Sequence, residues 1–555
     1  MTLLEQCQIW NEKDEYQKII DTIEAIPEES RTPELCSELA RAYNNAADVD
    51  DKQMYEKALS LLLPYEEHFQ GDHNWNFRVG YAYYYLDQEG QALRYFEQAL
   101  EARPGDEDTQ QMIDDCRRRL ALPRFDPSFR ERTQEAWAAF SKVEAQLRQL
   151  LDVRDRSAVQ EELISLCETA LLPAFLNPAF EVGHNGQKYE LILTPEGNLA
   201  RLYELVYFQR HAPAELLEHW NFPVGRQASV NFSIRTAAGM EISGQDVRVL
   251  PEKTDDDSLS LTLYCEALLP LLREDENQAW WLLSTLVDQV LGEIPAMALI
   301  RGFDISDTPL DGEDMLLSDL PAWVQQMGFE VPASAGDYLD SAYAVYQMKP
   351  EQDPEADWRL DTVSGSTRLP VLVGDYLRAE SDTMDLLHQD GVMAGFLIYP
   401  LDTFTGENRS EAILSFRDEL EAALLDQAGE DAFTLLGGAT GLYAGYLDFI
   451  AWDLPAVLDA AVAFFEKSGL PWASFHSFRR DVSTVRLISP EEAPLTPAPA
   501  PNVDPETGSL LSQEDIKTLE SFIGDVSGYF YRALDYLETF VENGVKSHRF
   551  TEQQA

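Results

Sequence analysis

Residues 75–104 read WNFRVGYAYYYLDQEGQALRYFEQALEARP, and this stretch decides the fold of the N-terminal part of the chain. Small and large side chains recur along it at helical spacing, first Val79, Gly80 and Tyr83 and then Ala92, Phe96 and Ala99. Small residues let two helices approach closely, and the aromatic rings fill the space between them. The stretch therefore predicts two packed helices, the second of which ends at Pro104.

The same positions resemble the tetratricopeptide repeat, a helix pair of about 34 residues. One departure is Asn76, where the family usually has Trp; Trp75 comes one residue early. A second unit precedes the first and is marked by Leu39, Ala40 and Tyr43, then by Ala58 and Leu62 after an insertion. Residues 16–27 and 106–120 resemble single helices of flanking units. The resemblance therefore predicts helical repeats of the tetratricopeptide type over residues 1–122.

The resemblance also implies a binding surface. In this family, ligands lie in the concave face that the first helix of each pair lines. Carried over by position, the implied binding residues are Phe77, Tyr81, Tyr84 and Tyr85 of the clear repeat, with Arg41, Asn44 and Asn45 of the preceding one. Tyrosine-rich grooves suit peptides, because each ring buries apolar area and offers a hydroxyl. The alternative is that Tyr84 and Tyr85 pack against the next helices or the downstream region.

Two further helices are predicted as a hairpin connector over residues 123–175. Asp126 and Pro127 are expected to serve as the N-cap and first residue of a helix over 126–151. Apolar residues then recur at helical spacing from Phe129 to Leu150. A second helix, over residues 157–171, is expected to fold back on the first.

The sequence pattern changes to mixed strands and helices after residue 176. In the first α+β module, residues 176–330, a hairpin is predicted from strand 189–194 through the turn 195–198 into an extended segment, 199–208. The other elements expected there are a helix over 214–220, strands over 229–234 and 259–264, a helix over 274–291 and a strand over 297–303. Strands and helices that do not alternate regularly as β-α-β units favour an α+β fold.

The second α+β module, residues 331–488, begins with an acidic lead-in. Strands are predicted over 369–373, 395–398, 433–436, 443–451 and 472–478, with helices over 381–390, 410–428 and 455–468. The glycine-rich LGGATG, residues 436–441, lacks the lysine of a phosphate loop and is predicted to be a hairpin turn. The two modules suggest related ferredoxin-like sandwiches, so the predicted fold class is multidomain α and α+β.

The C-terminal part is predicted to be a linker and a helix. Residues 489–509 are proline-rich and read as an extended linker. Residues 510–555 carry an apolar stripe at helical spacing and predict a long amphipathic helix. Such a helix either docks on the body of the protein or mediates self-association through a second chain.

The charge balance is strongly acidic. The chain has 98 acidic and 42 basic residues, a formal net charge of -56. This argues against binding nucleic acid or an anionic membrane, both of which require basic patches. The acidity has three explanations: it keeps the protein soluble, it reflects a composition bias of the source, or it steers a basic partner toward the surface. The sequence leaves all three open.

The cysteines and the N-terminal sequence favour a cytoplasmic location. Cys7, Cys36, Cys116, Cys167 and Cys265 lie far apart, as reduced and mostly buried thiols do. The N-terminus has neither the basic nor the apolar region of a signal peptide, and the chain has no run of about eighteen apolar residues.

No catalytic, metal or cofactor motif is found. His211 and His219 flank two glutamates but lack the spacing of a zinc helix. Residues 255–257 are most simply a solvated turn, and Arg479 and Arg480 are expected to pair with carboxylates. The sequence thus predicts a non-enzymatic adaptor that binds a protein or peptide partner. One alternative is an acidic inhibitor or immunity-type protein that neutralises a basic partner; another is an enzyme in the α+β modules with the repeats as recruiter.

Overall fold

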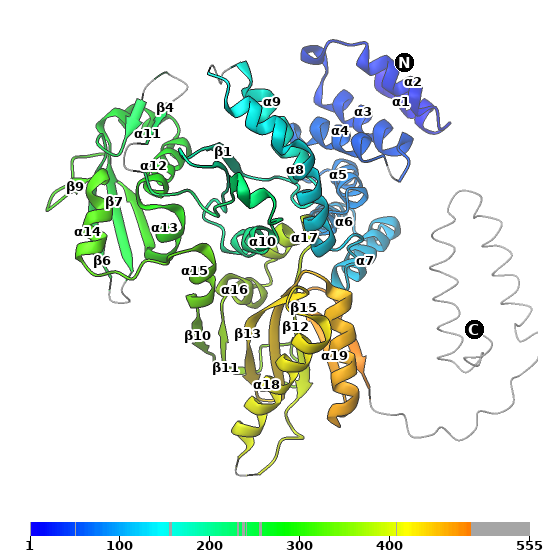
Figure 1. Ribbon diagram of the computed structural model, residues 1–555. Coiled ribbons are helices and arrows are strands. Elements are labelled where there is room, and N and C mark those ends of the chain that lie inside the picture. Colours follow the sequence, from blue (N-terminus) through cyan, green and yellow to red (C-terminus); the bar gives the residue numbers. More distant parts are fainter. Residues whose placement is uncertain are drawn as a thin grey trace, which may run out of the picture. The chain divides into compact units, whose positions relative to one another are not determined.

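The computed structural model describes residues 2–489, except 50, 155–157, 230–231, 236–238, 240, 255–257 and 407. Residues 1–488 form one compact unit, shown in Figure 1. The predicted turn at 255–257, most of the predicted linker and the predicted C-terminal helix lie outside the described residues.

The N-terminal array consists of successive packed helices (Figure 1). They are α1 (Leu3–Asn11), α2 (Tyr16–Glu24), α3 (Pro33–Ala46), α4 (Lys52–Leu62), α5 (His73–Tyr85), α6 (Glu89–Ala102) and α7 (Glu107–Ala121). Each helix packs against the next, and α3 also packs against α1 and α5. Helices α5 and α6 confirm the pair predicted from residues 75–104.

Local sequence signals explain where these helices begin and why they pack closely. The Asp72 carboxylate accepts a hydrogen bond from the Trp75 backbone N–H at 2.7 Å, which caps the start of α5. Gly80 faces Phe96 so closely that a Cβ atom would lie 2.9 Å from the ring. The small residue predicted at the helix contact is therefore required there.

The connector helices are α8 (Phe129–Leu151) and α9 (Gln160–Leu171), which pack against each other. The predicted cap of the first helix is wrong. Ser128 is the N-cap, and it forms a capping box with Glu131. Asp126 and Pro127 precede the helix, because the Ser128 hydroxyl accepts from the Glu131 backbone N–H and starts the helix two residues later than predicted.

The segment after the connector corrects the predicted hairpin. Its strands are β1 (Phe180–His184), β2 (Tyr189–Leu193) and β3 (Trp220–Asn221), and its helix is α10 (Leu199–Arg210). The hairpin partner of β2 is β1, and residues 199–208, which were predicted to be a second strand, belong to helix α10. Their side chains from Leu202 to Phe208 are all buried, which removes the polar face that marks a helix in sequence. The helix predicted at 214–220 is a single 3₁₀ turn, Leu216–Glu218.

Residues 232–329, here called the lobe, have a hydrophobic core of their own, which extends from Ile242 to Val324. The lobe contains β4 (Ser233–Arg235), β5 (Glu241–Ser243), β6 (Arg248–Lys253), β7 (Leu259–Tyr264), β8 (Ile300–Ile305), β9 (Met315–Leu316), α11 (Leu269–Glu274), α12 (Glu276–Leu291), α13 (Glu293–Leu299) and α14 (Leu320–Gln326). Its main sheet has the order β8-β7-β6-β9, in which β7 and β8 are parallel. The strand predicted at 297–303 starts only at Ile300, because α13 precedes it.

Residues 344–488, here called the sheet domain, form one antiparallel sheet with the order β10-β11-β13-β14-β12-β15-β16. Its strands are β10 (Ala344–Gln347), β11 (Thr362–Thr367), β12 (Met393–Pro400), β13 (Phe433–Gly441), β14 (Ala444–Ala451), β15 (Ala473–Ser477) and β16 (Val485–Ile488). The helices α15 (Ala335–Ser341), α16 (Pro370–Arg378), α17 (Asp382–Gln389), α18 (Arg409–Ala428) and α19 (Leu454–Ser468) precede or flank them.

The chain order β12-α18-β13-β14-α19-β15 with the sheet order β13-β14-β12-β15 is that of a ferredoxin-like sandwich. The expected ferredoxin-like topology therefore holds for the sheet domain. It does not hold for the lobe, whose strand order differs and whose sheet contains a parallel pair.

Two predictions within the sheet domain are wrong. Residues 369–373 begin α16 instead of forming a strand, because Pro370 stands in its first turn with a preset backbone angle. The LGGATG segment lies inside β13 instead of forming the turn. Gly437 is needed there, since its φ is 143° and a Cβ atom would lie 2.2 Å from the Ser366 carbonyl oxygen.

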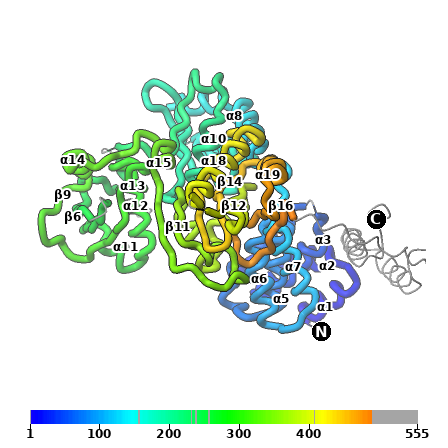
Figure 2. The backbone as a smooth tube through the Cα atoms, turned by 90° about the horizontal axis from the view of Figure 1, so that it is seen from below, coloured from blue at the N-terminus to red at the C-terminus, as the bar shows by residue number. Residues whose placement is uncertain are grey.

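One hydrophobic cluster joins the connector and α10 to the sheet domain. Trp137 of α8 stacks on Phe208 of α10 at 4.3 Å, and its indole N–H donates to the Phe208 carbonyl at 2.9 Å. The array meets the sheet domain separately, through α6 against α17 and α7 against β15. Figure 2 shows α6 and α7 on the same side of the molecule as β16.

Candidate binding groove

A pocket of about 430 Å³ opens on the face of the array where α1, α3, α5 and the start of α7 come together. It is lined by Gln8, Arg41, Asn44, Asn45, His73, Asn74, Phe77, Arg78, Tyr81, Arg103, Asp106 and Asp108. Five of the seven predicted binding residues therefore share one surface. These five come from α3 and α5, the first helices of two successive pairs.

Two arginines of the groove share one carboxylate. Arg78 Nη2 donates to Glu38 Oε1 at 2.8 Å, and Arg41 donates to the other oxygen of Glu38. Within the described residues, Arg41 Nε is buried without a hydrogen-bond acceptor. Burial lowers the pKa of Arg78, although the Glu38 charge opposes the shift. This corner of the groove thus holds more positive charge than its carboxylate neutralises.

The opposite side of the groove comes from the turn between α6 and α7. Asp106 caps α7 by accepting from the Thr109 hydroxyl at 2.6 Å and from the Thr109 backbone N–H at 3.1 Å, and the hydroxyl contact above all lowers the pKa of Asp106. His73 Nε2 lies 3.5 Å from the Asp106 carboxylate, and Arg103 Nη1 lies 3.7 Å from it. A second carboxylate is therefore shared between two basic side chains.

Aromatic rings form one wall of the groove. Phe77 and Tyr81 have ring centroids 6.3 Å apart, and Tyr81 continues to Tyr85 at 4.7 Å. Tyr85 stacks on Tyr55 at 5.0 Å, nearly parallel. The wall offers flat apolar surface next to the arginines, which suits a ligand that has both an apolar and an acidic side chain.

The two predicted asparagines differ in their freedom to bind. Asn44 is buried and donates from Nδ2 to the Arg78 carbonyl at 2.9 Å, so it ties α3 to α5. Asn45 is exposed and donates to Asn11 at 3.0 Å. Asn45 is thus more accessible to a ligand, whereas Asn44 also holds the groove together.

Tyr84 and Tyr85 do not line the pocket. The Tyr84 hydroxyl donates to Asp115 of α7, and the Arg119 guanidinium lies 4.7 Å from its ring centre. Burial, strengthened by Asp115, raises the pKa of Tyr84. Both tyrosines make internal contacts behind the groove wall.

Sequence reasoning missed several lining residues. Asn74 and Arg78 stand one helical turn apart on α5, so helical spacing alone would have placed Arg78 beside the predicted Tyr81. Arg103, Asp106 and Gln8 had no comparable signal, because other helices bring them to the groove.

Other sequence clusters do not form sites. Among the described residues, no three His, Cys, Asp or Glu side chains are arranged to hold a metal ion. His211 instead bonds to the Tyr207 carbonyl at 2.7 Å. Arg479 pairs with Asp385 and Arg480 pairs with Asp357 at 2.6 Å, which confirms the predicted pairing with carboxylates. All five cysteines are buried and free, as expected.

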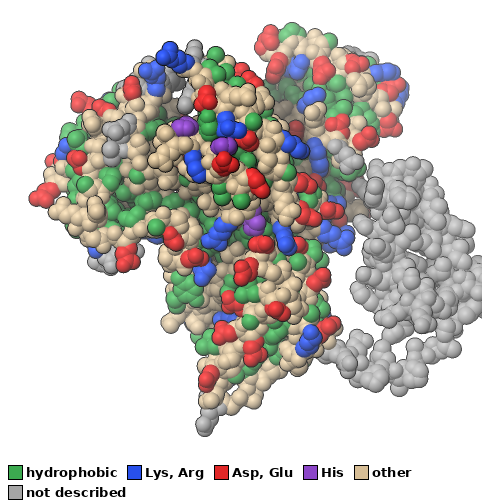
Figure 3. Space-filling model, in the orientation of Figure 1, with side chains coloured by type: hydrophobic (Ala, Val, Ile, Leu, Met, Phe, Trp, Pro, Cys, Tyr) green, Lys and Arg blue, Asp and Glu red, His purple; other side chains and the backbone are tan. Residues whose placement is uncertain are grey.

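Acidic side chains are spread over the face seen in Figure 3 and do not gather in one patch. Within the residues that the structure describes, no single helix is long and apolar enough to cross a membrane. Helices α12 and α13 are long and apolar enough only when taken together, and the chain bends by 105° where one ends and the other begins.

The chain matches no protein-family model, and no curated protein or solved structure is similar to it. The helical array is compatible with repeats of the tetratricopeptide type. The interpretation of the groove therefore depends on its own residues and their geometry.

Proposed function

We propose that this chain is a non-enzymatic cytoplasmic interaction protein whose array, a tetratricopeptide-type repeat, binds an extended segment of a partner protein in the groove. The observation that carries the proposal is the 430 Å³ pocket that joins aromatic side chains to two arginines sharing Glu38. An apolar side chain of the partner packs on Phe77 and Tyr81. An acidic side chain of the partner takes up the charge of Arg41 and Arg78.

The test is selection of peptides from a random displayed library on the full chain, followed by affinity measurement with a labelled selected peptide. Selected peptides are expected to be rich in Asp, Glu and apolar residues. Tyr81→Ala and Arg41→Ala are each expected to weaken binding at least tenfold, since central aromatic and arginine contacts dominate such interfaces. Equal affinity of wild type and both variants would exclude the groove as the binding surface.

Tyr343→Ala is the matched control. Tyr343 is 56% exposed, directly precedes β10 and the sheet domain, and does not line the groove. Its removal deletes the same side chain without touching the array, so peptide affinity is expected to be unchanged. Thermal unfolding of each variant separates loss of binding from loss of fold.

A second candidate function is neutralisation of a basic partner, and the net charge of -56 favours it. Binding of this kind weakens steeply with added salt, because screening acts on all the surface charges together. Binding in the groove is expected to keep its aromatic contribution at high salt. Capture of a basic protein that Tyr81→Ala does not affect, and that moderate salt abolishes, would favour the second candidate.

A further inference from the structure

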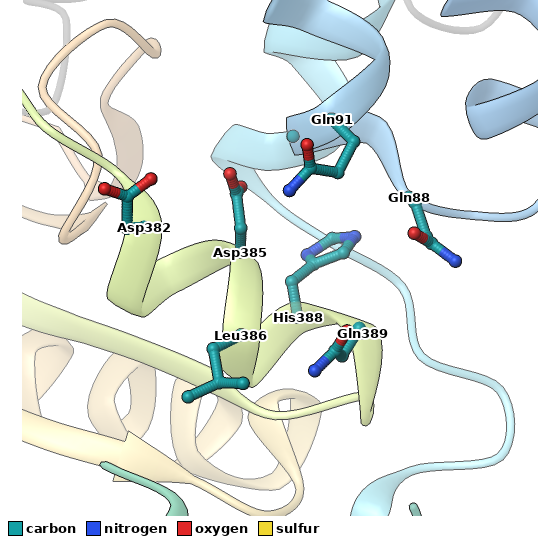
Figure 4. Close-up of a pocket in the computed structure, with 8 residues that line it drawn as sticks. Gln88, Gln91, Asp382, Asp385, Leu386, His388 and Gln389 are labelled. Atoms are coloured by element: carbon teal, nitrogen blue, oxygen red, sulfur yellow. The ribbon is translucent and has the colours of Figure 1, made fainter. Parts of the chain in front are cut away.

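The array is attached to the sheet domain through buried charged groups. Glu89, at the start of α6, lies with Oε2 2.9 Å from His388 Nε2 of α17, and both side chains are almost fully buried. Figure 4 shows Asp385 and His388 on α17 pointing toward α6. The adjacent pocket, about 270 Å³, is lined by residues of α6 and α17 and by Gln88.

Helices α6 and α17 approach each other closely at Gly90. A Cβ atom at Gly90 would lie 1.7 Å from Asp385 Oδ1, so the two helices touch backbone to side chain. Asp385 also accepts from Arg94 at 2.6 Å and pairs with Arg479. Phe125 places its ring edge against His388 at 4.9 Å.

Glu89 lies among groups from every neighbouring element. His388 faces it from α17, and Arg119 approaches its other carboxylate oxygen to 3.5 Å from α7. Burial alone would raise the pKa of Glu89, but the His388 hydrogen bond and charge, with Arg119, lower it. Glu89 is therefore held as a carboxylate at the contact.

A chain of direct contacts runs from this contact to the groove wall. Arg119 packs on the Tyr84 ring at 4.7 Å and donates to Asp115 at 3.2 Å. Tyr84 meets Tyr85 edge-on at 5.3 Å, and Tyr85 lies 4.7 Å from Tyr81. The helices that Glu89 anchors, α6 and α7, also flank the turn that brings Arg103 and Asp106 to the groove.

We propose that Glu89 and His388 are positioning residues for the groove. The sheet domain, through α17, holds α6 and α7 in place. These two helices in turn position Arg103, Asp106 and the ring of Tyr81 at the groove. The binding site then needs both the array and the sheet domain. This inference rests on the proposed function, since it assigns an effect on the affinity of the groove.

The test compares His388→Leu with His388→Gln in the full chain. Leucine removes the donor to Glu89, whereas glutamine keeps one N–H for it. His388→Leu is expected to weaken the selected peptide five- to tenfold and to speed backbone hydrogen exchange of residues 103–121 at least tenfold. His388→Gln is expected to restore most of both values. Asp382→Asn is the control, because Asp382 is an exposed second partner of Arg94.

Measurements are made at a temperature where circular dichroism shows every variant folded. A folded His388→Leu variant with wild-type exchange over 103–121 and wild-type peptide affinity would overturn the proposal. Loss of affinity that glutamine does not restore would also contradict it. If the wild type binds no peptide, the proposed function fails, and the hydrogen exchange alone decides whether His388 positions α6 and α7.

Discussion

Two arginine clusters of this chain use the same side-chain types in opposite ways. In the groove, Arg41 and Arg78 share the single carboxylate of Glu38. In the sheet domain, Arg359 has Asp448 to itself, with its two terminal nitrogens 2.5 and 3.2 Å from the carboxylate oxygens. The first cluster has two arginines for one carboxylate and is partly exposed at the groove, while the second has one arginine for one carboxylate and is fully buried.

The Arg359 cluster is also closed to ligands. Arg359 is only 1% exposed, and its Nη2 donates to the Tyr346 hydroxyl at 2.6 Å. The rings of Phe396, Tyr446 and Phe478 surround the guanidinium at 5.0, 5.4 and 5.2 Å. Arginine beside aromatic rings is thus buried in the core in one place and lines a surface pocket in the other, and the two sites differ in charge balance and in access.

Removing Asp448 gives the largest expected effect. Asp448→Ala leaves Arg359 buried without its counter-charge, so the free energy of unfolding is expected to fall by about 3–5 kcal/mol. Urea denaturation followed by circular dichroism measures the change. Arg41→Ala serves as the comparison and is expected to cost less, about 1–2 kcal/mol, because Arg41 is 20% exposed and Glu38 keeps Arg78 as its partner. Equal losses for the two variants would contradict the distinction.

A third arginine, Arg226, extends the comparison, because three carboxylates surround it. Arg226 lies 2.9 Å from Glu181, 3.5 Å from Glu196 and 3.6 Å from Glu293, between the lobe and β1, β2 and α10. Burial raises the pKa of the neighbouring Asp288 from 3.8 to about 7, and the Glu293 charge adds to the shift. This cluster therefore retains a proton near neutral pH.

The sign of the pH dependence follows from the raised pKa of Asp288. Ionising this carboxyl costs more in the folded protein than in the unfolded one, so stability is highest below about pH 4 for this group. It is lost as the pH rises to about 7, by roughly 4 kcal/mol. Asp288→Asn is expected to remove this dependence, as measured by hydrogen exchange of α12 at pH 5 and pH 8. A wild-type pH profile in the variant would count against the assignment.

Removing the shared carboxylate of the groove should alter binding more than stability. Glu38→Gln leaves Arg41 and Arg78 without a counter-charge, so an acidic peptide is expected to bind about three- to tenfold tighter at low salt. Fluorescence anisotropy with an acidic peptide measures this, and a peptide with lysines in place of its acidic residues is the control. Unchanged affinity for the acidic peptide would show that the arginines do not contact it.

The smallest effect on stability is expected for an exposed ion pair of one arginine and one glutamate. Arg117 and Glu97 join α7 and α6 on the surface at 2.7 Å, and neither lines the groove. Glu97→Ala is expected to change stability by less than about 0.5 kcal/mol and to leave peptide affinity unchanged. A larger loss would mean that surface pairs also hold the array together.

The predictions that succeeded depended on local patterns. The spacing of Val79, Gly80 and Phe96 identified the α5–α6 pair, and Gly80 is needed where the helices touch. Arg41 and Tyr81, which the resemblance assigns to one face, line the same pocket, and their part in binding stays a prediction. In each case helical geometry determines which side chains share a face. Their spacing along the sequence is therefore enough to predict that they lie together.

The helix and strand predictions that failed concern segments whose local pattern does not separate the alternatives. The side chains of α10 from Leu202 to Phe208 are all buried, and Pro370 opens a helix in a segment that reads as a strand. Gly437 and Gly438 lie within β13 because neighbouring backbone approaches them closely, and sequence alone suggests a turn. Periodicity distinguishes helix from strand only where one face meets water.

The helices of the array, the face that α3 and α5 present and the strongly acidic composition all follow from the residue order. Which of the 98 acidic residues faces which arginine follows only from the folded chain. Glu38 meets two arginines, Asp448 meets one, and Arg226 meets three carboxylates. Electrostatic energy depends on distance and burial, and packing between elements far apart in the chain sets both.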